Sequence, residues 1–363
     1  MSLLEKLTIV IPSYNRPEFL KRSINYWGKT DVNVVVIDGS ETGLCENFLL
    51  TTGSNIKYIH SLTSFANRLK IAISNVNTEF VALLGDDEYF VFESLEHSIE
   101  FLIKNIDYVS CGGQSLHFWY NFEKEEVIFK PAYKEFYYFD LSINDSNLRV
   151  IEHFRNYTCA YVYSIMRTNE WKCAMRVPSQ SDFTAYGNGE YAFEFIASYL
   201  GKSKMLPELN WFRSLENGRN VTSEKATNPK NSFSVWWTSW RFKEERSHFK
   251  QLIYSSFPSS SQISIKTFER TYKIAFDEFY KKFGYTLKRK VRHNLAKIRI
   301  FRSINDELKS IFSANSDRVK VKSIDDDLYD SNQILDYFKA VGISADIKSF
   351  HLVHKSILST YKQ

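Results

Sequence analysis

The first 110 residues alternate short runs of Val, Ile and Leu with stretches whose apolar residues recur at helical spacing. Such an alternation predicts strand–helix–strand units and a mainly parallel sheet. The runs show little polar alternation, which is typical of strands that are buried on both faces. We therefore expect an α/β fold in which helices flank a central sheet, with strands at Leu7–Ile11, Asn33–Ile37, Ile56–His60, Glu79–Leu84 and Tyr108–Cys111.

The remainder of the chain divides by composition into two further regions. Residues 112–228 hold aromatic and mixed segments with one clear amphipathic helix at Glu190–Leu200. We expect them to complete the domain that begins with residues 1–111. After residue 228 the sequence becomes Lys-rich and helical in pattern. The predicted organisation is one domain over 1–228 and a helical C-terminal region over 229–363.

Composition indicates a globular protein in a reducing compartment. At 363 residues and 44% hydrophobic content the chain can bury a sizeable core. Its four cysteines are scattered and form no C-x-x-C pair, which favours reduced thiols in a cytoplasm. No apolar run approaches the ~20 residues that span a bilayer, and Glu5 and Pro12 interrupt the segment where a signal peptide would be apolar. We expect a cytoplasmic protein whose sequons at Asn156 and Asn220 carry no glycan.

An acidic turn follows the fourth predicted strand, where the sequence reads LLGDDEYF from Leu83 to Phe90. In open α/β sheets, ligands bind beyond the carboxyl ends of the strands. Clustered carboxylates there repel one another, and a divalent cation such as Mg²⁺ or Mn²⁺ relieves the repulsion while holding substrate phosphates. The predicted metal ligands are Asp86, Asp87 and Glu88. The alternative is that Asp86 or Asp87 only caps the following helix.

Two earlier stretches accompany the acidic turn: TIVIPSYNRP at residues 8–17 and VVVIDGS at residues 34–40. Each is a strand that runs into a polar turn. Together with Asn67-Arg68 and GDDE, in this order and spacing, they resemble the nucleotide-sugar half of family 2 glycosyltransferases of the GT-A fold. The resemblance is close over residues 7–110 and looser over 110–215.

The resemblance implies a role for each matching residue. The nucleotide sugar would contact Pro12, Ser13, Tyr14, Arg16, Asp38, Asn67, Arg68 and Asp86. Among these, Asp38 would accept hydrogen bonds from the base or ribose, and Arg68 would neutralise phosphate charge. Leu84 stands where the family's D-x-D motif has its first Asp, so it remains open which carboxylates would bind the metal. Asp38 closing a turn and Arg16 pairing at the surface are the alternatives.

The resemblance also implies the chemistry of transfer. The family's base is a carboxylate near a helix N-terminus about a hundred residues after the metal motif, which makes Glu190 the first candidate and Asp182 the second. The alternative for Glu190 is a first-turn acid that complements the helix dipole. Trp211 and Arg213 are candidates for acceptor or phosphate contacts, although Trp211 also suits the core.

The family inverts the anomeric configuration, and this chain lacks the Q-x-x-R-W motif and membrane helices of processive members. We expect a non-processive enzyme of polysaccharide biosynthesis that adds one sugar to a glycan or lipid-linked glycan. UDP is the commonest nucleotide for this motif set, and GDP, TDP and CMP remain open.

The C-terminal third carries a strongly basic stretch. Residues 279–305 hold nine Lys or Arg and no Asp or Glu. Within it, 287–302 has the pattern of a basic amphipathic helix, which indicates contact with the inner face of a membrane. A solvated bundle helix and a dimer contact are the alternatives. We expect Trp236, Trp237 and Trp240 to lie in the core rather than to anchor the chain at a membrane interface. The acidic run 325–327 is assigned no chemistry.

Two other functions compete with a sugar transferase. Template-dependent RNA polymerases also place metal-binding aspartates in a Gly-Asp-Asp turn, but such an enzyme leaves residues 8–17 and 34–40 unexplained, and we expect no nucleic acid partner. A sugar- or glycan-binding protein that kept the fold but lost turnover is the second alternative, since Leu84 replaces an expected ligand.

Overall fold

The structure is a computed structural model that describes residues 2–180, 182–185, 187–216, 232–261, 263–283 and 328–361. The predicted domain boundary at residue 228 lies outside the described residues. The same holds for the basic stretch 287–302, the acidic run 325–327 and the sequon at Asn220.

A sheet of ten strands runs through the described residues in the order β3-β2-β1-β4-β9-β6-β10-β5, with β7 on β6 and β8 on β10. Its first four strands are parallel to one another, and so are β6 and β10. The pairs β4–β9, β6–β9, β6–β7, β5–β10 and β8–β10 are antiparallel. The strands are β1 (Leu7–Ser13), β2 (Asn33–Asp38), β3 (Ile56–His60), β4 (Phe80–Leu83), β5 (Tyr89–Phe90), β6 (Tyr108–Asn121), β7 (Glu126–Ala132), β8 (Asp140–Leu141), β9 (Ile165–Arg167) and β10 (Lys202–Ser214).

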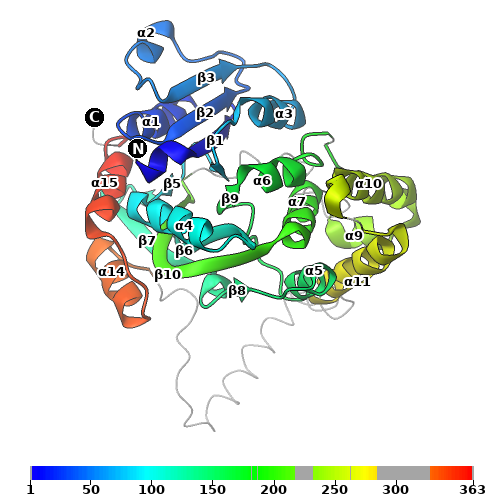
Figure 1. Ribbon diagram of the computed structural model, residues 1–363. Helices are drawn as coiled ribbons and strands as arrows, with labels where there is room; N and C mark the ends of the chain where they lie inside the picture. The colour runs from blue at the N-terminus through cyan, green and yellow to red at the C-terminus, as the bar shows by residue number, and fades with distance from the viewer. Residues whose placement is uncertain are drawn as a thin grey trace, which may run out of the picture.

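Helices cover the sheet, as expected for an α/β fold (Figure 1). Helix α3 packs on β1 and β2, α4 on β6 and β10, and α6 on β4 and β9. The described α-helices are α1 (Pro17–Trp27), α2 (Glu46–Leu49), α3 (Phe65–Asn75), α4 (Phe92–Lys104), α5 (Ser146–Arg155), α6 (Thr168–Met175), α7 (Asn188–Leu200), α9 (Phe233–Thr238), α10 (Lys243–Ser256), α11 (Ile265–Phe283), α14 (Ser331–Ala340) and α15 (Ile347–Leu358).

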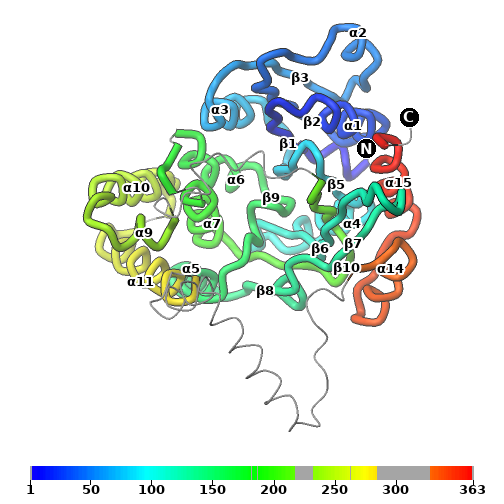
Figure 2. Tube along the Cα trace, turned by 180° about the vertical axis from the view of Figure 1, so that it is seen from behind, coloured from blue at the N-terminus to red at the C-terminus, as the bar shows by residue number. Residues whose placement is uncertain are grey.

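The helical C-terminal region packs against the domain in two separate places. Helices α9 to α11 gather beside α5 and α7 through an aromatic cluster in which Phe154 and Phe195 meet Phe276 of α11. Helices α14 and α15 lie at the opposite side of the sheet, next to β7 and α1 (Figure 2). There Tyr329 and Phe129 exchange two backbone hydrogen bonds of 2.8 and 2.9 Å. The last helix therefore ends beside the N-terminal part of the chain.

The expected strands are confirmed within a few residues. The strand expected at Ile56–His60 has those bounds, whereas the one expected to end at Cys111 continues to Asn121. The expected helix at Glu190–Leu200 starts two residues earlier, at Asn188. Within the described parts of the chain, no helix combines the length and the apolar character that crossing a bilayer requires.

Candidate functional site

The acidic turn occupies the connection between β4 and β5, at the carboxyl ends of the first parallel strands. The amide of Leu84 donates to the carbonyl of Val10 on β1 over 3.0 Å, so the chain leaves the sheet beside the end of that strand. Leu84 itself is buried. The position at which the family has its first Asp thus faces the apolar core here, and the carboxylates begin two residues later.

Asp86 and Asp87 share one guanidinium. Arg16 donates to both oxygens of Asp86 and to Oδ2 of Asp87, the last over 3.3 Å. The hydroxyl of Ser13, the last residue of β1, donates to Oδ2 of Asp86 over 2.6 Å. Asp86 is fully buried, and burial raises its pKa to about 7 even though Arg16 acts in the opposite direction. The turn therefore concentrates negative charge that one arginine only partly balances.

Arg16 reaches the turn because of the loop between β1 and α1. It is the N-cap of α1 and precedes Pro17, whose fixed φ suits the first helical position. Asn15 has a φ of 54°, and its amide donates to Ser40 Oγ over 2.8 Å. This hydrogen bond joins the loop after β1 to the loop after β2. The two loops lie side by side because these parallel strands end in register, with Ser13 beside Asp38.

Asp38 ends β2 and is buried. Its Oδ1 accepts from the amide and hydroxyl of Ser40, and its Oδ2 accepts from the hydroxyl of Tyr58 over 2.7 Å. These contacts match the turn-closing alternative for Asp38. A contact with base or ribose stays a prediction; Oδ2, which accepts one hydrogen bond here, has the capacity to accept a second.

Arg68 reaches the same strand ends from α3. Its guanidinium is buried, donates to the carbonyl of Ser13, and lies 5.5 and 5.6 Å from the ring centroids of Tyr14 and Phe65. Burial lowers its pKa, while Asp38 is the largest influence in the other direction. Tyr14 and Asn67 are exposed and Pro12 is partly exposed. The predicted nucleotide-binding residues are thus grouped around Ser13.

Glu88 turns toward a different set of side chains. Its Oε2 accepts from Trp211 Nε1 over 3.0 Å and from the Gly85 amide over 3.4 Å, and its Oε1 lies 4.0 Å from Arg213 Nε. Burial, followed by the charge of Asp87, raises the pKa of Glu88 to about 8. Glu88 therefore connects the acidic turn to β10, where Trp211 and Arg213 lie.

An aromatic stack surrounds Trp211. The rings of Tyr163 and Tyr133 lie nearly parallel to it, with centroids 4.5 and 5.5 Å away. Arg213 lies 5.1 Å from the Tyr133 ring centroid. Trp211 is only 1% exposed, which matches the core alternative for its own ring, whereas Tyr133 and Tyr163 are partly exposed.

Glu190 lies in the first turn of α7 and accepts a 2.7 Å hydrogen bond from the hydroxyl of Tyr157. Burial raises its pKa to about 7. Burial is the main reason that the pKa of the Cys159 thiol is raised, and the charges of Glu190 and Glu88 act in the same direction. Asp182 is exposed and stays a prediction as the second candidate base.

The contacts also test how well the acidic turn suits a divalent cation. In the described parts of the chain, no three His, Cys, Asp or Glu side chains converge as a metal-binding group. Asp86 and Asp87 nevertheless offer adjacent hard oxygen atoms to a single positive group, Arg16, and therefore fit Mg²⁺ or Mn²⁺ as two protein ligands. Glu88, whose carboxylate contacts Trp211 and Gly85, stays a prediction as a third.

Sequence reasoning missed several residues of this site. Tyr58, Tyr133 and Tyr163 touch the predicted residues from segments that carry no motif. Ser40 ends the VVVIDGS stretch but was given no role, although it binds both Asn15 and Asp38. Arg22 was also missed, although an arginine between the apolar residues of an amphipathic helix is a signal of a buried partner. The three clustered tryptophans are split, because Trp236 is buried and Trp240 is 87% exposed.

Comparison with known proteins finds a family match over part of the chain. Residues 8–164 match the model of glycosyl transferase family 2. The chain carries a glycosyl transferase family 2 domain. The protein is a glycosyltransferase, and its domain contains all the predicted nucleotide-binding and acidic residues. Glu190, Asp182, Trp211 and Arg213 lie beyond the matched residues, and no curated protein matches the chain.

Solved structures similar to this glycosyltransferase include S. aureus TarS residues 1–349, at 14% sequence identity and a TM-score of 0.48, covering 81% of this chain and 77% of that one. The same TarS fragment in complex with UDP-GlcNAc is 12% identical, also with a TM-score of 0.48, and covers 100% of this chain and 90% of the other. At TM-scores below 0.5 this likeness establishes neither a fold nor a ligand for the present chain.

Proposed function

We propose that this glycosyltransferase moves a sugar from a nucleotide-sugar donor to a hydroxyl group of a glycan or lipid-linked glycan, by a single inverting displacement and without processivity. The observation that carries the proposal is the pair Asp86 and Asp87 at the strand ends, faced by Ser13 and Arg16. Ligands of open α/β sheets bind at this edge.

At the donor end, charge is the main requirement. Arg16 and Arg68 supply positive charge beside Ser13, and arginine suits phosphate oxygens through its planar fork of donors. Asp86 and Asp87 would hold Mg²⁺ or Mn²⁺. The chemistry that such a cation supplies when bound is stabilisation of negative charge on the departing phosphate. Tyr14, exposed beside Arg68, offers its ring to the base.

At the acceptor end, a base must take the proton from the attacking hydroxyl. Glu190 suits this role because a pKa of about 7 allows it to be ionised yet basic near neutral pH. Tyr157 donates to Oε1 of Glu190 and so orients the carboxylate. Asp182 is the weaker candidate, because it is exposed to solvent and lies outside the regular helices and strands.

The remaining features support acceptor binding and inversion. Sugar rings stack on aromatic faces, and the partly exposed Tyr133 and Tyr163 present such faces next to Trp211 and Arg213. Inversion needs one base and no nucleophilic carboxylate close to the anomeric carbon. Membrane contact through residues 287–302 remains a prediction from the sequence.

A thermal-shift screen tests the proposal. UDP, GDP, TDP and CMP are added with and without Mn²⁺, because a ligand of the native state raises the melting temperature by mass action. We expect one nucleotide to stabilise the wild type with Mn²⁺ and the Asp87→Asn variant to lose that response. Asp31→Asn, at an exposed site in the turn before β2, is the matched control. A wild type that responds to no nucleotide contradicts the proposal.

A further inference from the structure

Arg22 is a buried cation in the helix that also positions Arg16. It lies on α1, six residues after Arg16, and is only 5% exposed. Its Nη2 donates to the backbone carbonyl of Asp87 over 3.3 Å. The two arginines of one helix therefore reach the acidic turn from different directions: Arg16 binds its carboxylates and Arg22 binds its backbone.

The position of Arg22 is set by a residue far along the chain. Nη2 also donates to Oε2 of Glu216 over 2.6 Å, and both side chains are almost completely buried. Glu216 follows β10, and its carboxylate further accepts from Ser214 Oγ over 3.5 Å. The faces of Phe19 and Tyr89 lie 4.9 and 5.5 Å from the guanidinium. A buried ion pair of this kind holds its partners in one geometry, since separating them leaves an unpaired buried charge.

The end of the chain completes the contact. The hydroxyl of Tyr361 interacts with both Glu216 and Arg22, and its ring stacks on Tyr120 with centroids 4.2 Å apart and planes at 8°. Five residues earlier, in α15, Ser356 Oγ lies 3.1 Å from the hydroxyl of Tyr89 in β5. Tyr89 belongs to the strand that follows Asp87, and Arg22 binds the carbonyl of Asp87.

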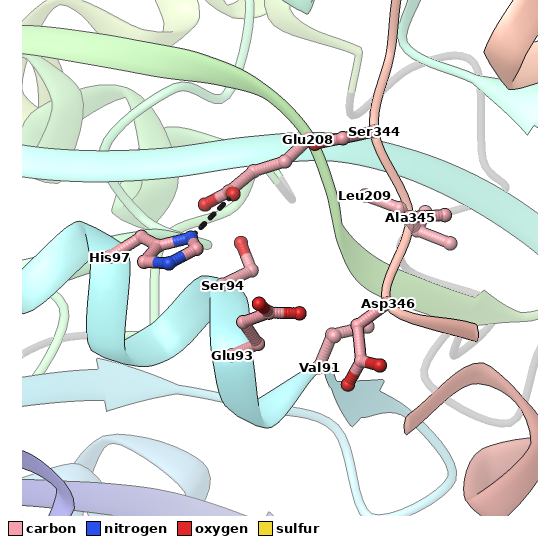
Figure 3. A pocket seen from close by; sticks show the side chains of 9 residues that line it. All are labelled: Val91, Glu93, Ser94, His97, Glu208, Leu209, Ser344, Ala345 and Asp346. Atoms are coloured by element: carbon pink, nitrogen blue, oxygen red, sulfur yellow. Dashed lines mark hydrogen bonds and ion pairs between the residues drawn. The ribbon is translucent and has the colours of Figure 1, made fainter. Parts of the chain in front are cut away.

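The segment before α15 adds a second contact in the same region. Ser344 to Asp346 run beside the first turn of α4, which follows β5, and together they line a cavity of about 220 Å³ with Glu208 of β10 (Figure 3). The amide of Leu209 donates to the Ser344 carbonyl over 2.8 Å. The C-terminal segment therefore lies along the chain that leaves the acidic turn, beside β5 and the first turn of α4.

We propose that Arg22 is a positioning residue of this transferase: it fixes the backbone of the acidic turn, and Glu216 and Tyr361 fix Arg22, so that the C-terminal segment sets the affinity for the donor. The physical reason is that Asp86 and Asp87 repel each other. Their separation depends on the backbone of the turn as well as on Arg16. The consequence for donor affinity rests on the proposed function, whereas the effect on the turn does not.

Tyr361→Phe is the first test, because it removes one hydroxyl and keeps the stack on Tyr120. Tyr337→Phe is the matched control, since its hydroxyl, on α14, lies 3.4 Å from that of Tyr137, which precedes β8. Hydrogen–deuterium exchange of a peptide covering residues 83–91 is followed without ligand. We expect faster exchange there in Tyr361→Phe and wild-type exchange in Tyr337→Phe. Equal exchange in all three proteins overturns the proposal.

The second test separates positioning from stability. The double variant Arg22→Met/Glu216→Leu removes both charges together, which leaves no unpaired buried ion and can preserve folding. We expect it to melt near the wild-type temperature but to bind UDP with Mn²⁺ about tenfold more weakly, as ~1.4 kcal/mol produces. A folded double variant with wild-type UDP affinity and wild-type exchange at residues 83–91 overturns the proposal. If the wild type does not bind UDP, the nucleotide that stabilises it in the screen replaces UDP in this titration. If it binds none of the four nucleotides, the donor assignment fails and the exchange measurement still decides the role of Arg22.

Discussion

Two buried carboxylates that share one arginine can exchange that partner for a ligand. Desolvation is the largest influence on Asp86, followed by Arg16, which favours its ionised form, and Asp87, which disfavours it. A divalent cation held by Asp86 and Asp87 would favour their ionised forms and would leave Arg16 free to contact phosphate oxygens. Binding of a cation and binding of an anion would then support each other.

Replacement of the candidate bases separates their roles. Glu190→Gln keeps the shape of the side chain and the contact with Tyr157 but removes the proton acceptor, so we expect kcat to fall by about 10²–10⁴-fold with little change in the KM for donor. Asp182→Asn serves as the comparison and is expected to keep kcat within a few-fold. Steady-state rates of sugar transfer check this, and a larger loss of kcat in Asp182→Asn would exchange the two assignments.

The pH dependence of the rate follows from the raised pKa of Glu190. A general base acts in its ionised form, and burial places the pKa of Glu190 at about 7. The rate should therefore fall as the pH decreases through 7 and level off above it. A pH–rate profile of kcat measures this, and the inflection should disappear in the residual activity of Glu190→Gln. A wild-type profile that is flat between pH 6 and 8 would contradict the assignment.

At the scale of elements, the turn after β2 shows how backbone and site are coupled. A Cβ atom on Gly39 would lie 2.7 Å from Cζ of Arg68, so only glycine leaves room for the guanidinium above this turn. Gly189, in the first turn of α7, is different, because the nearest atom to its Cβ would be Pro178 Cβ at 3.7 Å. The first glycine is therefore required by the site and the second is not.

These two glycines give a paired prediction. Gly39→Ala should displace the flexible end of Arg68 and weaken nucleotide binding several-fold at a small cost in stability. Gly189→Ala should raise the free energy of unfolding by about 0.5–1 kcal/mol, since alanine is the better helix former. Melting temperatures and UDP titrations of both variants provide the measurements. Unchanged UDP affinity in Gly39→Ala would show that Arg68 does not need its present position.

The sequence predicts those elements whose signal is local. Strands β1, β2 and β4 were predictable because each is a short apolar run between turn residues, and β3 because Ile and Tyr recur in a short β-rich run. The continuation of β6 to Asn121 was not, because its second half contains His and aromatic residues that acquire their burial from β7 and β10. The antiparallel insertion of β9 between β4 and β6 depends on contacts across more than 50 residues, which no local pattern records.

The site divides in the same way. Ser13, Arg16, Asp38, Arg68 and Asp86 follow strand ends or open helices, and motif order alone was enough to bring them together. The partners Arg22 and Glu216 are 194 residues apart, and each has an ordinary sequence neighbourhood. Charged residues so distant in sequence can be paired only when the sheet and the C-terminal segment are in place.

At the scale of the whole molecule, the chain returns to its start. Helices α9 to α11 pack beside α5 and α7, whereas α14 and α15 pack beside β7 and α1. The second group contributes fully buried side chains, among them Phe338, Phe350 and Ile357. Phe350 lies on Phe129 and Phe212, with ring centroids 5.2 and 5.4 Å away. The C-terminal segment is thus part of the same hydrophobic core as the sheet.

This shared core predicts that the segment and the sheet unfold together. Phe350→Ala removes a buried ring and should lower the free energy of unfolding by about 3–5 kcal/mol, whereas Leu352→Ala, at a 45% exposed position of the same helix, should change it by about 0.5 kcal/mol or less. Urea unfolding is followed by far-UV circular dichroism, which reports on all helices, and by tryptophan fluorescence, which reports on seven tryptophans, none of them in α14 or α15. Coincident transitions that shift together in Phe350→Ala are expected, because no large part of the core is independent of Phe350. If circular dichroism instead showed an early loss of helix while the fluorescence transition stayed at its wild-type midpoint, the C-terminal segment would be an independent unit, and it could not hold Arg22 in place.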